Sequence, residues 1–532
     1  MKRKIRKFFR NLMSGFFVFI LLLLVQIAIF VFFQFFLDDI LLNAGVIQSE
    51  FDFFIRLLIY VGVHLIEYTI ATLIFFKIIS KIEDPEFKIP WIVGMLLLPL
   101  LFSVLFLIFG NPRLKKKDRI IVKATRKAYR YHFMMDDEKQ EELLGELGHA
   151  YGTFKYVNTV TRVGAHKNNR VTYYKTGEEF FPVLMESLKL AKEFIFIEFF
   201  IIDDGKLWTE VLNILEAKAK EGVKIRIIYD DMGCSGTISP KTPKILKKRG
   251  IYAFKFHPFR PILSGVYNNR DHRKIVIIDH QMAFTGGMNL ADEYGNYIER
   301  FGYWKDTMVK IEGSAINNLL VTFLQNYNLC IDNVSDYNSY LAYEYPKYED
   351  EGYVMPFGDG PGGIDDHLIG EQTYINMLNY ATKEVYISTP YLVPTYPLLD
   401  AIRNASLRGV RVNLILPGIP DKKAVYLVAK SHFRFLLDAG VHIYIYKPGF
   451  NHMKTMLSDD ELAFVGTINY DFRSLVHHFE CGTLLFKNPC LKDIKEDFLQ
   501  MISVSEEVPE DFKLGLFKRI FCSIVKLIST LL

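Results

Sequence analysis

The amino-acid sequence predicts an α/β protein made of two similar halves behind an N-terminal α-helical membrane region. From about residue 166 onward, apolar strand-like segments alternate with amphipathic helical segments, which is the pattern of sheets covered by helices. The same succession of segments occurs twice, and the longest apolar runs lie in the first 112 residues. We therefore expect membrane helices followed by a duplicated α/β body.

The duplication is visible segment by segment. Three segments of the first half correspond to three segments of the second: LAKEFIFIEFFIIDDG to YATKEVYISTPYLVPT, KEGVKIRIIYDD to LRGVRVNLILPG, and KRGIYAFKF to DAGVHIYIY. Each half also predicts an amphipathic helix, at Trp208–Glu221 and at Leu398–Arg408, with a glycine before the next strand. We place the first half at residues 166–345 and the second at 346–510, joined near residues 345–363, which are rich in Gly, Pro and acidic residues.

A short motif recurs at constant spacing, once in each half. HRKIVIID starts at residue 272 and HMKTMLSD at residue 452, and an Asn follows each motif after the same interval. The repeated positions are His272, Lys274, Asp279 and Asn289 in the first half, and His452, Lys454, Asp459 and Asn469 in the second. A single His-x-Lys would be weak evidence, but two copies with identical offsets indicate a shared function.

The residue types of the motif suit a phosphodiester. His and Lys two apart on a strand point to the same face, so two motifs would bring two imidazoles and two ammonium groups to one pocket. The lysines, with the amides of Asn289 and Asn469, could hold the non-bridging oxygens without a metal or other cofactor. One imidazole could attack phosphorus, while the other protonates the leaving alkoxide and later deprotonates the incoming alcohol.

A nucleophilic histidine also needs a carboxylate at its other ring nitrogen. Glu480, downstream of the second motif, and Asp306, downstream of the first, are the candidates for this orienting role. Asp279 and Asp459 belong to the motif and are counted with the catalytic set. Each of them follows an apolar strand, however, where a capping or ion-pairing role is the simpler interpretation.

The repeated HxKxxxxD followed by GG or GT and then Asn resembles the phospholipase D superfamily. The segments NNRDHRKIVIID, GGMNLADEY, YWKD, TPYLVP, GFNHMK and NYDFRS are similar to bacterial cardiolipin synthases, and the resemblance runs from about Lys88 to the end of the chain. It implies that the two halves share one active site, where two phosphatidylglycerol molecules become cardiolipin and glycerol. It also favours His272 as the nucleophile.

Two residues depart from the family pattern outside the motif. His478 stands where the family often has Asn, and Phe199 where Tyr is commoner. A membrane-bound phospholipase D that hydrolyses phospholipid to phosphatidic acid remains an alternative, because the sequence does not show whether the pocket excludes water. A catalytically dead scaffold is disfavoured, since both motifs keep His, Lys and Asn.

Three apolar runs in residues 1–112 are long enough to cross a membrane. They are Phe16–Phe36, Leu57–Phe76 and Trp91–Phe109. We interpret the first as a retained anchor, because no cleavage site of small residues follows it before Asp38. His64 and Glu67 lie three apart in the second run, on one helical face, and are expected to form a packing pair.

Basic clusters flank this region at residues 2–10 and 115–130, and both favour the cytoplasmic side. Three full crossings cannot satisfy both clusters, so one run is re-entrant or interfacial, or the N-terminus breaks the rule. We expect a multi-pass protein of the bacterial cell membrane with a cytoplasmic catalytic domain. Residues 113–165 are expected to form a basic juxtamembrane segment against anionic lipid, followed by a polar linker at about 134–158.

Composition supports a membrane setting. The net charge is only +4, from 64 basic and 60 acidic residues, and the basic residues cluster beside apolar runs, so we expect no nucleic-acid partner. The five cysteines show no metal-ligand spacing and are expected to be reduced thiols.

Residues 511–532 predict a basic amphipathic helix in the membrane interface, with docking on the catalytic core as the alternative. The sequence does not predict the oligomeric state.

Overall fold

The computed structural model contains two compact units. One comprises Met1–Asn111, Arg260–Gly265 and Ser523–Leu532, and the other comprises Pro112–Phe259 and Val266–Cys522. The described residues are 51–81, 85–110, 114–133, 141–142, 144–258, 268–334, 340–341, 344–349, 351–361 and 367–529. The first predicted membrane run, 16–36, lies outside them.

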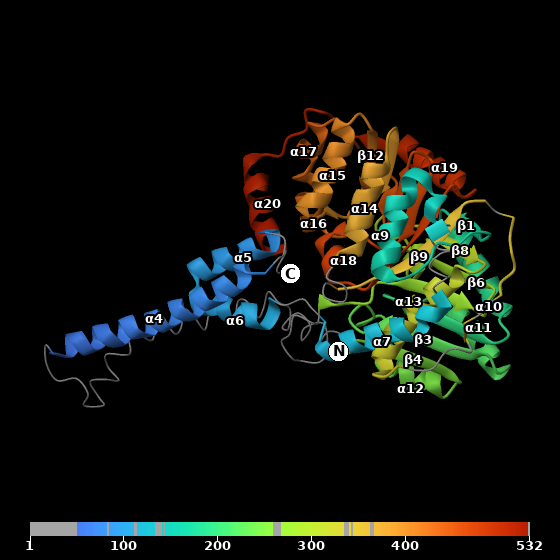
Figure 1. Cartoon of the computed structure of the whole chain (residues 1–532), viewed down its shortest axis with the longest axis horizontal. Coiled ribbons are helices and arrows are strands. Elements are labelled where there is room, and N and C mark those ends of the chain that lie inside the picture. Colours follow the sequence, from blue (N-terminus) through green and yellow to red (C-terminus); the bar gives the residue numbers. More distant parts are fainter. Residues whose placement is uncertain are drawn as a thin grey trace. The chain divides into compact units, whose positions relative to one another are not determined.

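The smaller unit contains three packed helices, α4 (Phe51–Ile79), α5 (Pro85–Leu97) and α6 (Pro99–Phe109) (Figure 1). In the described part of the chain, Val61–Ile79 is the one helical stretch long and apolar enough to cross a membrane. It overlaps most of the second predicted run. His64 Nδ1 lies 3.1 Å from Glu67 Oε2, so this polar pair is satisfied within α4 itself.

The third predicted run is not one spanning helix. It is broken at Leu98, where the backbone leaves the helical region, and Pro99 opens α6 at its first turn. The two helices fold against each other: Trp91 and Phe106 meet edge to face at 5.3 Å, and a Cβ on Gly94 would lie only 2.0 Å from the Phe102 ring. With 13 and 11 residues, neither helix reaches the length of about 20 needed to span. The run at residues 91–109 was expected to be long enough to cross, and the structure instead divides it into two shorter helices.

The larger unit contains two large sheets with the same strand order. The first sheet is β1 (Arg170–Tyr174), β8 (Met308–Glu312), β6 (Met282–Gly286), β5 (Lys274–Ile278), β2 (Phe194–Phe199), β3 (Lys224–Asp230) and β4 (Ile251–Phe256). The second is β9 (Tyr353–Asp359), β18 (Glu480–Phe486), β16 (Leu462–Gly466), β15 (Thr455–Ser458), β10 (Glu384–Ser388), β12 (Arg411–Pro417) and β13 (His442–Tyr446), with β19 (Ser505–Glu507) added at the edge. The predicted duplication is confirmed strand for strand.

The helices follow the repeat as well. The first half carries α10 (Gly177–Lys189), α11 (Lys206–Lys220), α12 (Thr242–Lys247) and α13 (Ile316–Ile331); the second carries α14 (Ile369–Tyr380), α15 (Tyr396–Leu407), α16 (Lys423–Lys430), α17 (Phe433–Leu437), α18 (Phe472–Val476) and α19 (Leu491–Ser503). The helices predicted from periodicity correspond to α11 and α15, each within two residues at either end.

One apolar core joins the two halves, because alternate residues of each strand point to opposite faces of its sheet. Phe196 of β2 and Ile277 of β5 share this core with Leu457 of β15, Phe323 of α13 and Phe498 of α19. The other face of the first sheet packs on α10 and α11 in a separate core. Both faces of the central strands are thus buried, which fixes the strand ends that carry the motifs.

Residues 113–165 are more structured than predicted. Helix α7 (Lys116–Phe133) packs on α13, where Asn328 donates a hydrogen bond of 2.9 Å to Thr125 (Figure 1). Its lysines at 116, 117 and 123 remain exposed. The stretch expected to be a linker at 134–158 includes most of α9 (Tyr151–Thr161), which packs against α14.

The C-terminal amphipathic helix is present as α20 (Leu516–Ser529). Cys522 is buried, and its thiol lies 3.4 Å from the Leu427 carbonyl oxygen. One side of the helix therefore contacts the larger unit. Phe517 is 87% exposed and Ile520 51% exposed. The helix therefore combines a docked side with uncovered apolar side chains.

Candidate active site

Two short parallel pairings join the halves at the starts of the two motifs. Strand β14 (Gly449–Asn451) pairs with β7 (Tyr303–Lys305), and Asp271 pairs with Phe479. The His452 amide donates to the Lys305 carbonyl at 2.7 Å, and the His272 amide donates to the Phe479 carbonyl at 2.8 Å. Each motif histidine therefore follows a residue that is anchored to the opposite half.

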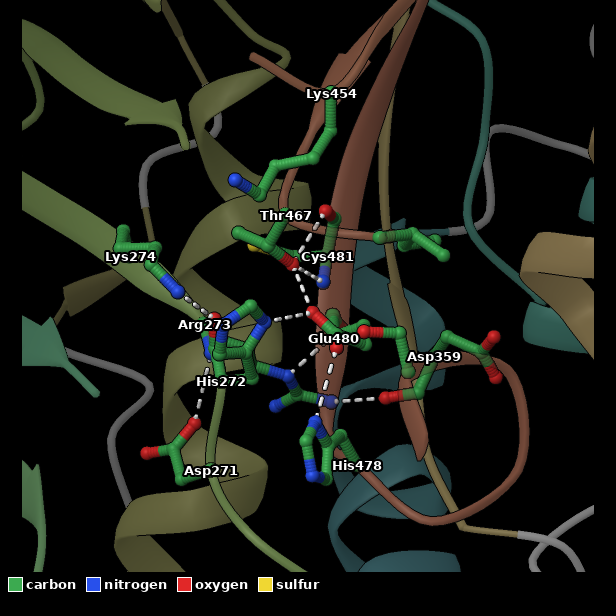
Figure 2. Close-up of polar contacts among 12 residues, drawn as sticks. Asp271, His272, Arg273, Lys274, Asp359, Lys454, Thr467, His478, Glu480 and Cys481 are labelled. Atoms are coloured by element: carbon green, nitrogen blue, oxygen red, sulfur yellow. Dashed lines mark hydrogen bonds and ion pairs between the residues drawn. The ribbon is translucent and has the colours of Figure 1, made fainter. Parts of the chain in front are cut away.

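These pairings place a carboxylate beside each motif imidazole: Glu480, which follows Phe479, lies beside His272, and Asp306, which follows Lys305, lies beside His452. His272 Nδ1 lies 2.9 Å from Glu480 Oε2, and His452 Nδ1 lies 2.6 Å from Asp306 Oδ2 (Figure 2 shows the first pair). Both carboxylates predicted to orient a histidine do contact one. In each case the carboxylate belongs to the other half, which the sequence did not reveal.

Both imidazoles are neutral. Burial lowers the pKa of His272 to about 3 and holds the pKa of His452 well below its ordinary value. Because each Nδ1 faces a carboxylate, the single ring proton is assigned to Nδ1, which donates to that carboxylate. The Nε2 atom of each ring is then left with a free lone pair.

The two carboxylates differ in their electrostatic surroundings. Burial opposes ionisation of Glu480, but the adjacent His272 and His478 outweigh it and hold the pKa of this carboxyl far below its usual range. The Thr467 hydroxyl also donates to Glu480. For Asp306, burial prevails over the neighbouring Lys454 and raises the pKa to about 6.

The two motif lysines are fully buried beside the histidines. Lys274 is the first residue of β5 and donates to the His272 carbonyl at 2.6 Å, while Lys454 precedes β15 and contacts the His452 carbonyl. Burial lowers the pKa of Lys274 to about 8 and that of Lys454 to about 7, and the charge of Lys274 contributes to the second shift. Two ammonium groups close enough to repel each other form a natural site for an anion.

The two motif asparagines are not equivalent. Asn289 accepts from the Ile201 amide at 3.0 Å and donates to the Tyr294 hydroxyl at 2.7 Å. Asn469 is also buried, but its Oδ1 makes no hydrogen bond with any described residue. The Asn289 amide is thus fixed by the first half, whereas the Asn469 amide keeps more hydrogen-bonding capacity.

The motif aspartates lie at the opposite strand ends from the histidines and act as caps. Asp279 accepts from the backbone amides of residues 192, 193 and 194 at 2.7–2.9 Å, and Asp459 accepts from those of residues 382, 383 and 384 at 2.7–2.9 Å. Each thereby fixes the start of β2 or β10. These contacts are those of the capping role considered for Asp279 and Asp459 in the sequence analysis.

One supporting residue was not anticipated. The side chain of Arg273 is 1% exposed and donates to the Glu480 carbonyl at 3.0 Å, the Thr322 carbonyl at 2.6 Å and the Asp359 carbonyl at 2.9 Å (Figure 2). It fixes the backbone of the residue that orients His272. The sequence offered one indication of this role. A charged residue stands between the motif His and Lys, and on a strand its side chain would point to the opposite face from theirs, into the core.

The two departures from the family pattern have different surroundings. Phe199 is buried in the core that packs on α10 and α11, and in the pairing of β2 with β5 it lies directly opposite the motif residue Lys274. The neighbouring Phe200 is the ring that meets His272, at 5.0 Å between centroids. His478 lies in the site: its Nδ1 is 3.4 Å from Glu480 Oε1 and its ring centroid is 5.5 Å from that of His272.

Comparisons with known proteins agree with this architecture. A family model described as "Cardiolipin synthase, PLD-like domain" matches residues 184–318 and 374–502, one match in each half. An uncharacterized protein of Streptococcus mutans is 41% identical over 84% of this chain and 96% of its own length. Cardiolipin synthase 2 of Bacillus anthracis is 32% identical over 85% of this chain and 88% of its own length.

A solved structure shares the fold at low sequence identity. The phosphatidylserine synthase of Haemophilus influenzae superposes with a TM-score of 0.54 at 15% identity, covering 71% of this chain and 97% of that protein. The family match in both halves, the extent of the relatives' similarity and the paired motifs lead to one conclusion: the chain belongs to the phospholipase D superfamily, close to the cardiolipin synthases.

Proposed function

We propose that this protein is a cardiolipin synthase that transfers a phosphatidyl group between two phosphatidylglycerol molecules through a phosphohistidine. The observation that carries the proposal is the crossing of the two imidazole–carboxylate pairs between halves, around two buried lysines. The relationship to cardiolipin synthase 2 of Bacillus anthracis supports the choice of lipid.

In the first step, His272 is the nucleophile. Its Nε2 lone pair attacks the phosphorus of phosphatidylglycerol, and the bond from phosphorus to the headgroup glycerol oxygen breaks. Glu480 stabilises the charge that develops on the ring, since this carboxylate stays ionised and receives an additional hydrogen bond from Thr467. His272 therefore keeps a free lone pair throughout the neutral pH range.

His452 and Asp306 supply the proton to the departing glycerol. The raised pKa of Asp306, about 6, means that this pair takes up a proton at a much higher pH than the His272–Glu480 pair. One reason lies in the repeat itself: Gly287 occupies the position of Thr467 in the first half, and a Cβ there would lie 2.0 Å from Asp306 Oδ1. Asp306 thus receives no equivalent hydroxyl.

In the second step, the roles of the pair reverse. The neutral His452 accepts the proton of a terminal glycerol hydroxyl on a second phosphatidylglycerol, and that oxygen attacks the phosphohistidine. The phosphorus–nitrogen bond breaks, cardiolipin forms and His272 is regenerated. Lys274 and Lys454 hold the non-bridging oxygens in both steps, because each step adds negative charge at phosphorus.

We further propose that the enzyme is a multi-pass protein of the bacterial cell membrane with its catalytic unit in the cytoplasm. If the first apolar run and α4 each cross once, the α5–α6 pair need not cross, since both of its helices are short. An even number of crossings leaves the basic residues at 2–10 and 115–130 on the same side. The exposed basic face of α7 and the uncovered apolar residues of α20 suit a surface of anionic lipid.

The test is a reaction with a single lipid. The purified protein in detergent is incubated with phosphatidylglycerol alone, and the products are separated. Cardiolipin and glycerol in equal amounts support transfer. Phosphatidic acid as the main product would replace the proposal with hydrolysis, in which water resolves the phosphohistidine.

A further inference from the structure

Three side chains at one end of the site form a cluster of metal-ligating type. One ligand atom each from His272, His478 and Glu480 lies within 4.8 Å of the others, and in the described part of the chain no other group of three or more His, Cys, Asp or Glu meets this condition. His272 and His478 both present Nδ1 to the same carboxylate, one to each oxygen (Figure 2). The cluster therefore surrounds Glu480 from two sides.

The His478 contact is not a satisfied hydrogen bond. Its Nδ1 lies 3.4 Å from Glu480 Oε1, which is longer than the usual range for N–H···O. Both atoms are buried, and neither makes a hydrogen bond with any other described residue. Buried polar atoms left in this way are unfavourable. If His478 carries its proton on Nε2, its Nδ1 and the carboxylate oxygen both offer lone pairs, and a cation between them would satisfy both.

The ligand set fits zinc-like ions. Two imidazoles and one glutamate, with a fourth position open, are a set that Zn²⁺ uses in proteins, at about 2.0–2.2 Å from each ligand atom. A tetrahedral site of that size places ligand atoms about 3.3–3.5 Å apart. His272 Nδ1 lies 2.9 Å from Oε2 of Glu480 and His478 Nδ1 lies 3.4 Å from its Oε1, so each imidazole nitrogen is near this spacing from one carboxylate oxygen.

Among the described residues, the equivalent pair of His452 and Asp306 is not part of such a cluster. Trp304 stands two residues before Asp306, as His478 stands two residues before Glu480. The Trp304 ring packs against His452 at 5.7 Å between centroids and offers no metal ligand. This exchange of His478 for Trp304 adds to the asymmetry of the site, and among the described residues the pair of His272 and Glu480 is the one completed by a third metal-ligating side chain.

We propose that His272, His478 and Glu480 form an inhibitory site for a zinc-like divalent ion. The ion binds Nδ1 of His272 in place of the hydrogen bond to Glu480. A neutral imidazole coordinated through Nδ1 carries its proton on Nε2, so the lone pair that attacks phosphorus is lost. The inhibition rests on the proposed function, whereas the binding of the ion does not.

Direct binding tests the site independently of activity. The full-length, tag-free protein in detergent is stripped with EDTA, dialysed and titrated with ZnCl₂ by calorimetry and with CoCl₂ by absorption. We expect one tight ion and a tetrahedral Co²⁺ spectrum. His478→Asn should weaken the affinity by more than about tenfold, and Glu480→Gln should do the same.

The matched control is His442→Asn, which makes the same exchange at a partly exposed histidine on strand β13 that pairs with Glu507. Its affinity should equal that of the unaltered protein. Equal affinity in the unaltered protein and His478→Asn, or no binding to the unaltered protein, would overturn the proposal. Thermal unfolding gives a second measure, because Zn²⁺ should raise the Tm of the unaltered protein and not that of His478→Asn.

Activity is compared within each protein as the ratio of turnover with and without Zn²⁺. The stripped enzyme should be active in EDTA, Zn²⁺ should inhibit it reversibly, and His478→Asn should need more than about tenfold more Zn²⁺ for the same inhibition. Tight Zn²⁺ binding without inhibition would overturn the regulatory part. If no protein turns over phosphatidylglycerol, the proposed function fails and the binding result still decides the metal site.

Discussion

Nδ1 of His272 lies 2.9 Å from Oε2 of Glu480, a residue 208 positions later in the chain and in the opposite half of the catalytic unit. The equivalent contact joins His452 to Asp306 across 146 positions in the reverse direction. Among the described residues, each motif histidine is hydrogen-bonded through Nδ1 to a carboxylate of the other half. The activity we propose therefore needs both halves, which explains why both copies of the motif are intact.

Replacing either motif histidine should abolish transfer. His272→Ala lacks the nucleophile and His452→Ala lacks the general acid, so each single variant should have no measurable cardiolipin formation. The double variant should be about as inactive as either single one, because residues that act as a unit give strongly non-additive losses. Substantial turnover by either single variant with phosphatidylglycerol would contradict the two-histidine mechanism.

The carboxylates that contact a motif histidine of the other half should be nearly as important for turnover as the histidines themselves. Glu480→Gln presents an amide to His272 Nδ1 and removes the charge that stabilises the imidazolium, so kcat should fall by roughly 10²–10⁴-fold with a smaller change in KM. Glu461→Gln, in the turn between β15 and β16, is the control and should retain full activity. A kcat for Glu480→Gln within a factor of two of the unaltered enzyme would remove Glu480 from the mechanism.

The pH profile should show the acid of the first step. The His452–Asp306 pair must hold a proton to act as the acid, and the pKa of Asp306 is about 6, so kcat/KM should fall as the pH rises above that value. The fall should steepen as Lys454 and Lys274 lose their protons near pH 7 and 8. The nucleophile adds no acid limb in a series from pH 5 to 9, since the pKa of His272 is about 3. A kcat/KM that increases between pH 6 and 8 would contradict these roles.

Asp279 should affect stability rather than chemistry. Asp279→Asn keeps the size of the side chain but weakens three hydrogen bonds to the start of β2, which should cost about 1–3 kcal/mol of unfolding free energy. Thermal unfolding measures this loss as a lower Tm. Turnover per folded molecule, measured well below the Tm, should be unchanged, and a loss of kcat in fully folded protein would return Asp279 to the catalytic set.

Much of the fold could be predicted from the sequence because it is periodic. Strand and helix patterns recur in both halves, and the constant spacing of His272 and Lys274 with His452 and Lys454 identified the centre of the site. The contact of Glu480 and Asp306 with the motif histidine of the other half could not be predicted in the same way. It depends on the parallel pairings of residues 271 with 479 and 451 with 305, which are contacts distant in sequence with no local pattern.

The break in the third apolar run has a local cause. Hydropathy alone describes residues 91–109 as one apolar run, but Pro99 cannot donate the backbone hydrogen bond of a helix interior and is well placed at a helix start. The sequence contained this information in a single residue. The capping role of Asp279 and Asp459 was likewise indicated by their position after an apolar strand, although the motif had placed them in the catalytic set.

The most direct test of the mechanism is to trap the covalent intermediate on His272. The enzyme is mixed with phosphatidylglycerol labelled at the headgroup phosphate and quenched in alkali, because a phosphohistidine is destroyed by acid. The account predicts label on His272, none in His272→Asn, and slower formation and breakdown in His452→Asn. Label on His452 and not on His272 would reverse the assigned roles, and no label under any alkaline quench would contradict the covalent route.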